Sequence, residues 1–545
     1  MLRLDSLLPP CRCSLAAATR AQRTLLHTRR DLHASSRRNL RHGDVFSQQH
    51  SLFAGDSDAG ENYAFVTASE LQGHKSPPTA VRMLVRDFID DSLYNPNYGY
   101  FSKSVKILNT THEEPFKFPK IKNGSEFEAL VGSRYAGMGK DPAQGPGKQV
   151  WHTPTELFRP HYGQAIAKCL VSEYLLKYFP YEDLIIYEIG AGNGTLAQDI
   201  LDVIQEDYPD VYERTQYNIV EISSTLADLQ RKRLGSRHGG VCKVIRRSVF
   251  DWDKRVPSPS FFVMMEVADN FSHDLIRYDT RTLEPYQGIV EISSSGEFSL
   301  VYTPVMDPLI TSFLNLRSAL SHPLPSVNPL LARSPALRSL LSNAPFAPNL
   351  TTPEFIPTRL ISLFQILHKY FPRHRLLLSD FSSLPDSVPG INAPVVQTRL
   401  RGNMVPCSTF LVKQGFFDIF FPTDFERVRD MYEHILSLPP TYNDPSSSTP
   451  HAVIPDRPTP LTPYTSSLSL DSGFFFPSAR YQVGHRRRLV EGVLSASGLP
   501  VGERKSSVWS HREFLETYVD ELGNTTLRNG ENPMLEWYEN VKVLF

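Results

Sequence analysis

The sequence predicts an α/β fold built on a mostly parallel sheet. A strand, a glycine-rich turn and a helix follow one another between residues 184 and 204. Further short apolar runs follow, separated by segments of helix length, which is the pattern of parallel strands joined by crossover helices. The strands are expected to end at Glu188, Glu221, Asp251 and Glu266. Because ligands of such sheets bind at the carboxyl ends of the strands, we expect the site at this edge.

The N-terminal 42 residues have the composition of a mitochondrial transit peptide. They contain nine arginines, no lysine and two acids. A disordered basic arm for RNA or acidic lipid is the alternative interpretation. Removal of this segment would leave acids in excess of lysine and arginine by about eight. We therefore expect no nucleic-acid partner for the mature chain.

Composition also limits the class of protein and the kinds of site that this chain can contain. The chain has 545 residues, 41% of them hydrophobic, which is enough for one large domain with appendages or for two domains. No apolar run reaches about 18 residues, so we expect no membrane span. Two of the five cysteines lie in the first 42 residues and the other three are scattered. This argues against a disulfide framework or a zinc site, and for a reducing compartment.

The chain divides by composition around one main domain, expected at 76–435. Residues 43–75 are expected to be a linker, and residues 439–470, dense in Pro, Ser and Thr, a disordered segment. Residues 476–545 form a C-terminal segment. Within the main domain we expect a polar, loop-like insertion at 104–150 and a helical insertion at 305–370.

Two helices are expected before the glycine turn, at Thr79–Ser92 and at Tyr162–Phe179, because apolar residues recur at helical spacing. After the glycine turn we expect strands at Tyr217–Glu221, Val241–Val249 and Ser260–Glu266, and then a hairpin of Gly288–Ile292 and Glu297–Tyr302. A later strand is expected at Arg375–Asp380, and a last pair at Ser408–Val412 and Phe416–Phe421.

The glycine turn follows the apolar run Leu184–Ile189 and precedes a helix from Thr195. Its glycines allow positive backbone torsions and close approach of a ligand, and the helix presents free amides. The spacing E-x-G-x-G-x-G differs from the dinucleotide pattern G-x-G-x-x-G, and it suits a nucleoside ligand without a pyrophosphate. S-adenosylmethionine fits, with its amino-acid end at the turn. The candidate binding residues here are Glu188, Gly190, Ala191, Gly192, Asn193 and Gly194.

Two acids extend this candidate site. Glu221 ends the next strand, 27 residues after Gly194, where it would accept hydrogen bonds from the ribose hydroxyls. Asp251 follows the third strand and is a further candidate. The alternative is that the turn is an ordinary strand-to-helix connection and that Glu221 ends a strand in solvent.

Several stretches together resemble one family, the mitochondrial and bacterial S-adenosylmethionine-dependent methyltransferases that include a complex I assembly factor. Met265–Ser272 keeps Glu266 and Asp269 in register with the family pattern N-E-F-F-D-A-L-P. A weaker similarity is Asp380–Ser382, to D-Y-G. The other stretches are Arg86–Tyr100, similar to F-M-x-x-A-L-Y-x-P-x-x-G-Y-Y, Thr153–Gly163, Glu188–Leu196, and Gly415–Phe425, similar to G-x-x-D-I-T-A-H-V-D-F.

The resemblance implies a class I methyltransferase fold, Rossmann-like, with a helical N-terminal part, insertions and a C-terminal appendage. It also implies an activity: symmetric dimethylation of an arginine in the 49 kDa-type subunit of complex I, in the mitochondrial matrix, supporting assembly. Glu266 and Asp269 would hold the guanidinium, whose planar fork matches carboxylates, and would take up the released proton.

Other interpretations remain open for the acids and for the whole chain. Glu266 could cap the next helix and Asp269 could be a solvated acid. The protein could also be a non-catalytic assembly chaperone that binds S-adenosylmethionine as a structural ligand. A small-molecule or RNA methyltransferase is a third possibility, which the acidic mature charge weakens.

Overall fold

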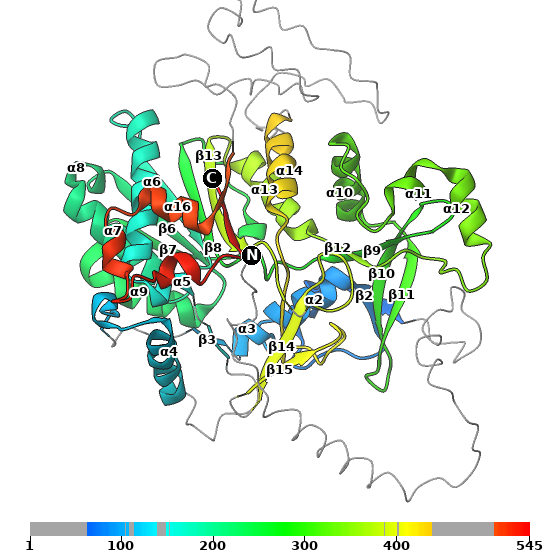
Figure 1. Cartoon of the computed structure of the whole chain (residues 1–545). Helices are drawn as coiled ribbons and strands as arrows, with labels where there is room; N and C mark the ends of the chain where they lie inside the picture. The colour runs from blue at the N-terminus through cyan, green and yellow to red at the C-terminus, as the bar shows by residue number, and fades with distance from the viewer. Residues whose placement is uncertain are drawn as a thin grey trace, which may run out of the picture. The chain divides into compact units, whose positions relative to one another are not determined.

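A computed structural model describes residues 63–103, 105–107, 114–138, 149–151, 153–385, 387–400, 403–438 and 506–545 (Figure 1). The expected transit peptide at 1–42 and the Pro/Ser-rich segment at 439–470 lie outside these residues. So do most of the expected linker and the first thirty residues of the C-terminal segment.

A seven-stranded sheet forms the centre of the fold, in the order β17-β18-β13-β8-β5-β6-β7. The five strands from β13 to β7 run parallel, whereas β18 is antiparallel to β13 and β17 to β18. The bounds are β5 Leu184–Ile189, β6 Thr215–Glu221, β7 Cys242–Arg246, β8 Ser260–Met265, β13 His374–Phe381, β17 Val508–Ser510 and β18 Val541–Leu544. The mostly parallel sheet is confirmed, and the expected third strand is shorter, with a 3-10 turn, η4 Val249–Asp251, after it.

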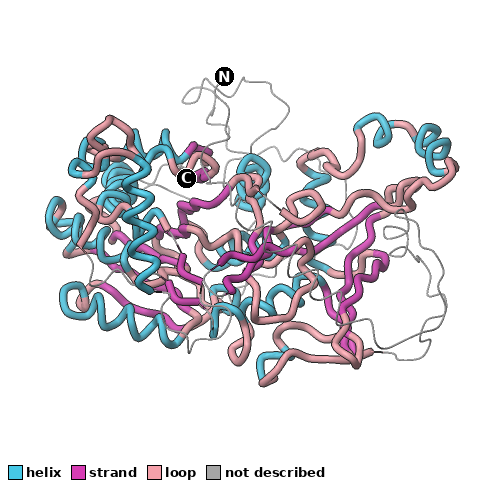
Figure 2. Tube along the Cα trace, turned by 60° about the horizontal axis from the view of Figure 1, so that its bottom comes forward, coloured by secondary structure: helices cyan, strands magenta, loops and turns pink. Residues whose placement is uncertain are grey.

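Apolar side chains on both faces of this sheet explain why its strands are continuous hydrophobic runs. In β5, Leu184 and Ile186 face one core, and Ile185, Tyr187 and Ile189 face the other. The first core is closed mainly by α6 His161–Lys177, α7 Thr195–Asp207, α9 Ser224–His238 and α16 His511–Tyr518. The second is closed mainly by α10 Pro308–Ala319, α13 Thr358–Tyr370 and α14 Phe425–Ser437. Figure 2 shows these helices gathered around the strands.

A second sheet has the order β1-β2-β10-β9-β12, with β11 on β10, and a third has the order β15-β14-β16. Helix α2 Val85–Tyr94 packs in the core that they share. The bounds are β1 Ala64–Phe65, β2 Val81–Leu84, β9 Asp274–Tyr278, β10 Pro285–Ile292, β11 Phe298–Pro304, β12 Glu354–Ile356, β14 Val395–Leu400, β15 Asn403–Cys407 and β16 Asp418–Phe420.

Two sequence-based assignments in this region are wrong. Residues 81–84, expected to be helical, form strand β2 because they pair with β10, far away in the sequence. The helix starts only at Val85. Residues 408–412 are not a strand, since the partners of β14 are β15 and β16. The expected hairpin is confirmed as β10 and β11.

Residues 104–150 are more structured than the expected loop. Within them lie a 3-10 helix, η3 Phe118–Lys120, and α4 Gly124–Met138, together with the two-stranded pair β3 Val105–Ile107 and β4 Gln149–Trp151. Phe118 and Phe127 are fully buried and contact Phe158 near the start of α6. The loop assignment is therefore wrong for α4, which aromatic packing attaches to the first core.

The expected helical insertion contains α10, α13, α11 Pro329–Arg333 and α12 Pro335–Ser342, together with β12.

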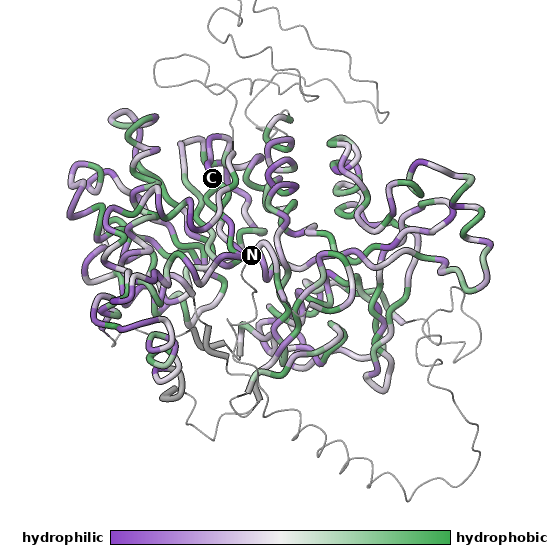
Figure 3. Tube along the Cα trace, viewed as in Figure 1, coloured by the Kyte–Doolittle hydropathy of each residue, from purple (hydrophilic) through white to green (hydrophobic). Residues whose placement is uncertain are grey.

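The C-terminal residues complete the central sheet. Strand β18 lies beside β13, and α16 packs on α6 (Figure 1). The remaining short helices are α3 Tyr100–Lys103, α5 Pro154–Leu157, α8 Pro209–Tyr212, α17 Pro533–Glu536, η1 Glu70–Gly73 and η6 Leu522–Thr525. Hydrophobic residues follow the strands, whereas the outer helices mix both kinds (Figure 3). Among the described residues, no helix is long and apolar enough to cross a membrane.

Candidate active site

The glycine turn after β5 has the backbone geometry that its sequence predicts. Gly190, Gly192 and Gly194 have φ angles of 72°, 54° and 75°, in the left-handed region. A Cβ on Gly190 would lie 2.8 Å from Cγ2 of Val267, in the loop that follows β8. The turn therefore packs closely against the residues after β8, and Gly194 leads directly into α7.

A buried carboxylate that the sequence did not single out holds the turn in place. Glu156, in α5, accepts hydrogen bonds from Nδ2 of Asn193 at 3.1 Å and from Oγ1 of Thr195 at 2.7 Å. On the other side, Nη1 of Arg233 donates to the carbonyl oxygen of Asn193 at 3.0 Å. The stretch Thr153–Gly163 thus has a structural purpose: it anchors the glycine turn.

Glu221 is joined to the same turn through Gln230. The Glu221 carboxylate accepts from the amide of Ser223 at 2.8 Å and from Nε2 of Gln230 at 3.0 Å. The same Nε2 donates to the carbonyl oxygen of Gly192 at 2.8 Å. Glu221 is buried, so it does not end its strand in solvent, and this burial raises the pKa of its carboxyl group. The Oε1 atom of Gln230 is buried and has no hydrogen-bond partner, which leaves one acceptor beside the turn.

The other predicted cofactor residues differ in exposure. Glu188 is buried and accepts from the hydroxyl of Tyr217 at 2.8 Å; burial raises the pKa of Glu188 to about 7. Ala191 and Asn193 are buried as well. Asp251 lies at the end of η4 with its side chain exposed. A role of Glu188 or Asp251 in ligand binding stays a prediction.

A cluster of four carboxyl groups lies where β8 and β13 end, next to the glycine turn. Glu266 and Asp269 follow β8, Asp380 lies in β13, and Asp418 lies in β16. Asp380 accepts hydrogen bonds from the amide of Asp269 at 3.0 Å and from its neighbour Phe381 at 2.8 Å. We call these four groups the carboxyl cluster.

Two oxygens of the carboxyl cluster are buried without a partner. Asp418 accepts from Nδ2 of Asn270 at 3.2 Å through Oδ1, but its Oδ2 has no hydrogen bond. Oδ1 of Asp269 also has none. Asp269 and Asp418 are 2% and 0% exposed, so both lie away from bulk solvent. Buried polar atoms are rarely left in this state, and a cationic ligand would satisfy both.

The electrostatics of the carboxyl cluster favour a cation. Burial raises the pKa of Asp269 well above its usual range, and the charges of Asp380 and Asp418 raise it further. Burial also raises the pKa of Asp418 well above its usual range. Burial and the charge of Asp380 raise the pKa of Glu266 in the same way, and burial raises the pKa of Asp380 to about 7. Like charges at close range cannot all ionise unless a cation compensates them. Glu266 has a φ of 55°, uncommon for a residue with a side chain.

Both alternatives that the sequence left open for these acids are wrong. No helix begins at Glu266, because residues 266–273 form bends and turns up to the start of β9. Asp269 is buried rather than solvated. The structure brings Glu266 and Asp269 together as predicted, and it adds Asp380 and Asp418.

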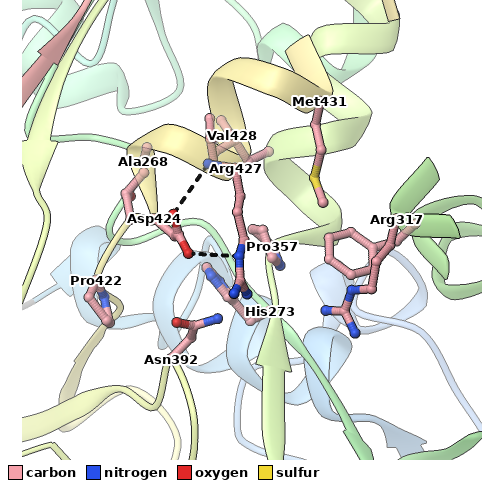
Figure 4. A pocket seen from close by; sticks show the side chains of 13 residues that line it. Ala268, His273, Arg317, Pro357, Asn392, Pro422, Asp424, Arg427, Val428 and Met431 are labelled. Carbon is pink, nitrogen blue, oxygen red and sulfur yellow. Dashed lines mark hydrogen bonds and ion pairs between the residues drawn. The ribbon is translucent and has the colours of Figure 1, made fainter. Parts of the chain in front are cut away.

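A small cavity of about 30 Å³ lies beside the same loops (Figure 4). It is lined by residues of α10, α13 and α14 and of neighbouring loops, including Ala268, Arg317, Thr423 and Arg427. Arg427 pairs with Asp424 at 3.2 Å, and Arg317 pairs with Glu354. These charged side chains of the cavity thus pair with other side chains, unlike those of the carboxyl cluster.

Comparison with known proteins agrees with this geometry. A model of S-adenosyl-L-methionine-dependent methyltransferases matches residues 165–441, just over half of the chain. The chain belongs to this family. The resemblance seen in the sequence is thereby confirmed, and S-adenosylmethionine is the cofactor. The positive-φ glycines, the N-terminus of α7 and the unpaired acceptor of Gln230 are compatible with this ligand.

One curated relative is the protein arginine methyltransferase NDUFAF7 homolog, mitochondrial, of Schizosaccharomyces pombe. It is 28% identical over 327 residues, which cover 58% of this chain and 67% of the relative. Two crystal structures from Burkholderia thailandensis are also similar. One, a COG1565 superfamily member bound to S-adenosyl-homocysteine, has 15% identity, coverage of 68% of this chain and 74% of that chain, and a TM-score of 0.40. The other, a native structure, has 13% identity, the same coverage and a TM-score of 0.39.

Proposed function

We propose that this methyltransferase acts on protein arginine, and that it symmetrically dimethylates an arginine in the 49 kDa-type subunit of complex I in the mitochondrial matrix, supporting assembly. The observation that carries the proposal is the buried carboxyl cluster beside the glycine turn, in which Oδ1 of Asp269 has no hydrogen-bond partner. The name of the yeast relative, a mitochondrial protein arginine methyltransferase, supports the same acceptor and compartment.

The shape and charge of arginine suit the carboxyl cluster. A guanidinium is planar, stays charged at all physiological pH values and offers five N–H donors in a fixed fork. Two carboxylates can therefore hold it in one orientation, whereas the ammonium of lysine is a rotating point charge. Transfer of a methyl group needs such positioning, because most of the rate comes from alignment of the acceptor nitrogen.

The residues of this chain would bind, orient and deprotonate the acceptor. When bound, S-adenosylmethionine supplies a methyl group on a sulfonium sulfur; the new C–N bond forms as the C–S bond breaks, and the electron pair stays on sulfur. Asp269 would hold the guanidinium through its unpartnered oxygen. The acceptor nitrogen loses one proton, and Glu266, which keeps some accessible surface, would take it and pass it to water.

The raised pKa values make substrate binding a proton-linked step. Without a cation the carboxyl cluster retains protons at a pH where ordinary acids have lost them. A guanidinium that enters stabilises the ionised forms, so protons leave as arginine binds. We therefore expect the affinity for arginine to increase from pH 6 to pH 8.

Mass spectrometry of the 49 kDa-type subunit, from cells with and without this protein, tests the proposal. We expect a symmetric dimethylarginine to disappear on deletion and to return with the wild-type chain but not with Asp269→Asn. The control is Asp228→Asn, which makes the same charge change at a side chain that is 77% exposed. Unchanged methylation with impaired complex I assembly would instead support the assembly chaperone that binds S-adenosylmethionine.

A further inference from the structure

The two acids that the tertiary structure adds to the carboxyl cluster differ in how their oxygens are used. Both oxygens of Asp380 accept backbone amides, one from Asp269 and one from Phe381. Asp418 has one oxygen occupied by Asn270 and one, Oδ2, unpartnered. Both residues are fully buried, so the difference lies in bonding and not in exposure.

We propose that Asp418 is the second guanidinium ligand, acting with Asp269, and that Asp380 is a positioning residue that holds the loop after β8. This inference rests on the proposed arginine methyltransferase function and assigns residues to its substrate site. Asp418 has the free acceptor that a ligand needs, and Asp380 does not.

Distant segments hold Asp418 rigidly, as a ligand that must not move requires. In the third sheet, Asp418 lies opposite Gln397 of β14. Asn270 donates to Oδ1 of Asp418 and to the carbonyl oxygen of Ile419, both at 3.2 Å. The amide of Phe421 donates to the carbonyl oxygen of Asp269 at 2.8 Å, which ties the two carboxylate-bearing segments together.

The turn before β16 is fitted just as closely to the N-terminal part of the domain. Gly415 has a φ of 81°, and a Cβ there would lie 2.0 Å from the carbonyl oxygen of Tyr98. The hydroxyl of Tyr94 donates to the carbonyl oxygen of Asn270 at 2.9 Å. The stretch Arg86–Tyr100 therefore supports the segment that carries Asp418, which explains its aromatic residues without a direct role in catalysis.

Calorimetry at pH 8 tests the inference with the full chain saturated with S-adenosylhomocysteine. The probe is N-acetyl-arginine amide, with N-acetyl-lysine amide for comparison. We expect Asp418→Asn to weaken arginine binding at least about tenfold, since a buried charged pair is lost. The affinity for S-adenosylhomocysteine should stay within about twofold of the wild type, and Asp228→Asn should change neither.

A stability measurement separates a ligand from a structural residue. Asparagine at 418 keeps an oxygen to accept from Asn270 and removes a buried, uncompensated charge. Asp418→Asn should therefore melt at the same or a higher temperature at pH 8. Asp380→Asn should melt lower, because an amide group cannot accept from both backbone amides.

Formate provides a second test in Asp418→Ala, since a small carboxylate can occupy the space that the side chain leaves. We expect formate to restore part of the affinity of this variant for N-acetyl-arginine amide. A formate effect in Asp380→Ala of the same size would contradict the distinction between the two acids.

The outcomes separate the inference from the function on which it rests. Full arginine affinity in Asp418→Asn would overturn the inference and leave the proposed function standing. Loss of the folded state or of S-adenosylhomocysteine binding in both Asp418 variants would assign Asp418 a structural role and also overturn it. A wild-type chain that binds S-adenosylhomocysteine but no arginine would overturn the proposed function itself.

Discussion

The glycine turn and the carboxyl cluster, the proposed cofactor side and substrate side of this site, are built in opposite ways. Around the glycine turn the polar side chains bond to one another: Glu156 holds Asn193, and Gln230 links Gly192 to Glu221. In the carboxyl cluster Asp269 and Asp418 each keep a buried oxygen without a partner. The side chains of the glycine turn thus satisfy one another, whereas ionised carboxylates in the carboxyl cluster carry an electrostatic cost that a cation or a proton must offset.

The origin of the residues differs as well. The glycine turn, Glu221 and Gln230 come from one continuous strand-helix-strand-helix segment between β5 and α9. The carboxyl cluster combines the ends of β8 and β13 with β16, which belongs to another sheet. The carboxyl cluster therefore depends on the packing of the whole domain.

The largest expected effect is on the cofactor side. Gly192→Arg places a long side chain in the turn at a φ of 54°, a conformation that costs a side-chain-bearing residue about 1–2 kcal/mol. We expect no S-adenosylhomocysteine binding, by calorimetry, at concentrations that saturate the wild type. Unchanged affinity would contradict the position of the cofactor site.

Asp269→Asn should separate the two sides. It removes one of the two buried carboxylates with a free oxygen, and truncating a buried charged pair typically costs 2–5 kcal/mol. We expect methyl transfer to an arginine peptide to fall by about 100-fold or more, measured by radiolabel incorporation. S-adenosylhomocysteine affinity should persist; its loss would mean that the two sides are not independent.

Gln230→Leu should weaken the cofactor side alone. The substitution removes the donor that bridges Gly192 and the Glu221 carboxylate, and a hydrogen bond to a charged group is worth about 1.5–3 kcal/mol. We expect S-adenosylhomocysteine to bind roughly tenfold more weakly in calorimetry. Gln216→Leu, at an exposed position in β6, is the matched control and should bind normally. An effect of the same size in both variants would argue against a specific bridge.

The smallest effect is on stability against pH. A carboxyl group whose pKa is raised on folding binds more protons in the folded state, so the free energy of unfolding falls as pH rises. The pKa of Asp380 is raised to about 7, and those of Asp269 and Asp418 are raised well above the usual range. The loss of stability therefore starts at about pH 4 and continues through pH 7 and above. Urea unfolding at pH 5.5 and pH 8 should show a smaller decrease for Asp418→Asn than for the wild type, by about 1 kcal/mol. An equal decrease in both proteins would mean that Asp418 does not contribute to it.

The elements that the sequence predicted well are those with local signals. Strands β5, β6, β8 and β13 were recognisable because both faces are buried, which makes their residues apolar without interruption. Strand β2 was mistaken for the start of a helix, because its apolar positions continue the spacing of α2 and only pairing with β10 makes it extended. The same limit explains β18, whose pairing with β13 spans the Pro/Ser-rich segment.

By itself, the sequence determined the glycine turn and the cofactor, since these depend on residues close together in the chain, and it determined the family through several short stretches that are each continuous. It also predicted Glu266 and Asp269 as site residues, Glu266 from its place at the end of a strand and both acids through a resemblance. The tertiary structure alone decided that Glu156 and Gln230 hold the turn and that Asp380 and Asp418 join the carboxyl cluster. The physical reason is that burial and unpaired charge are properties of three-dimensional surroundings, and segments about 150 residues apart create them here.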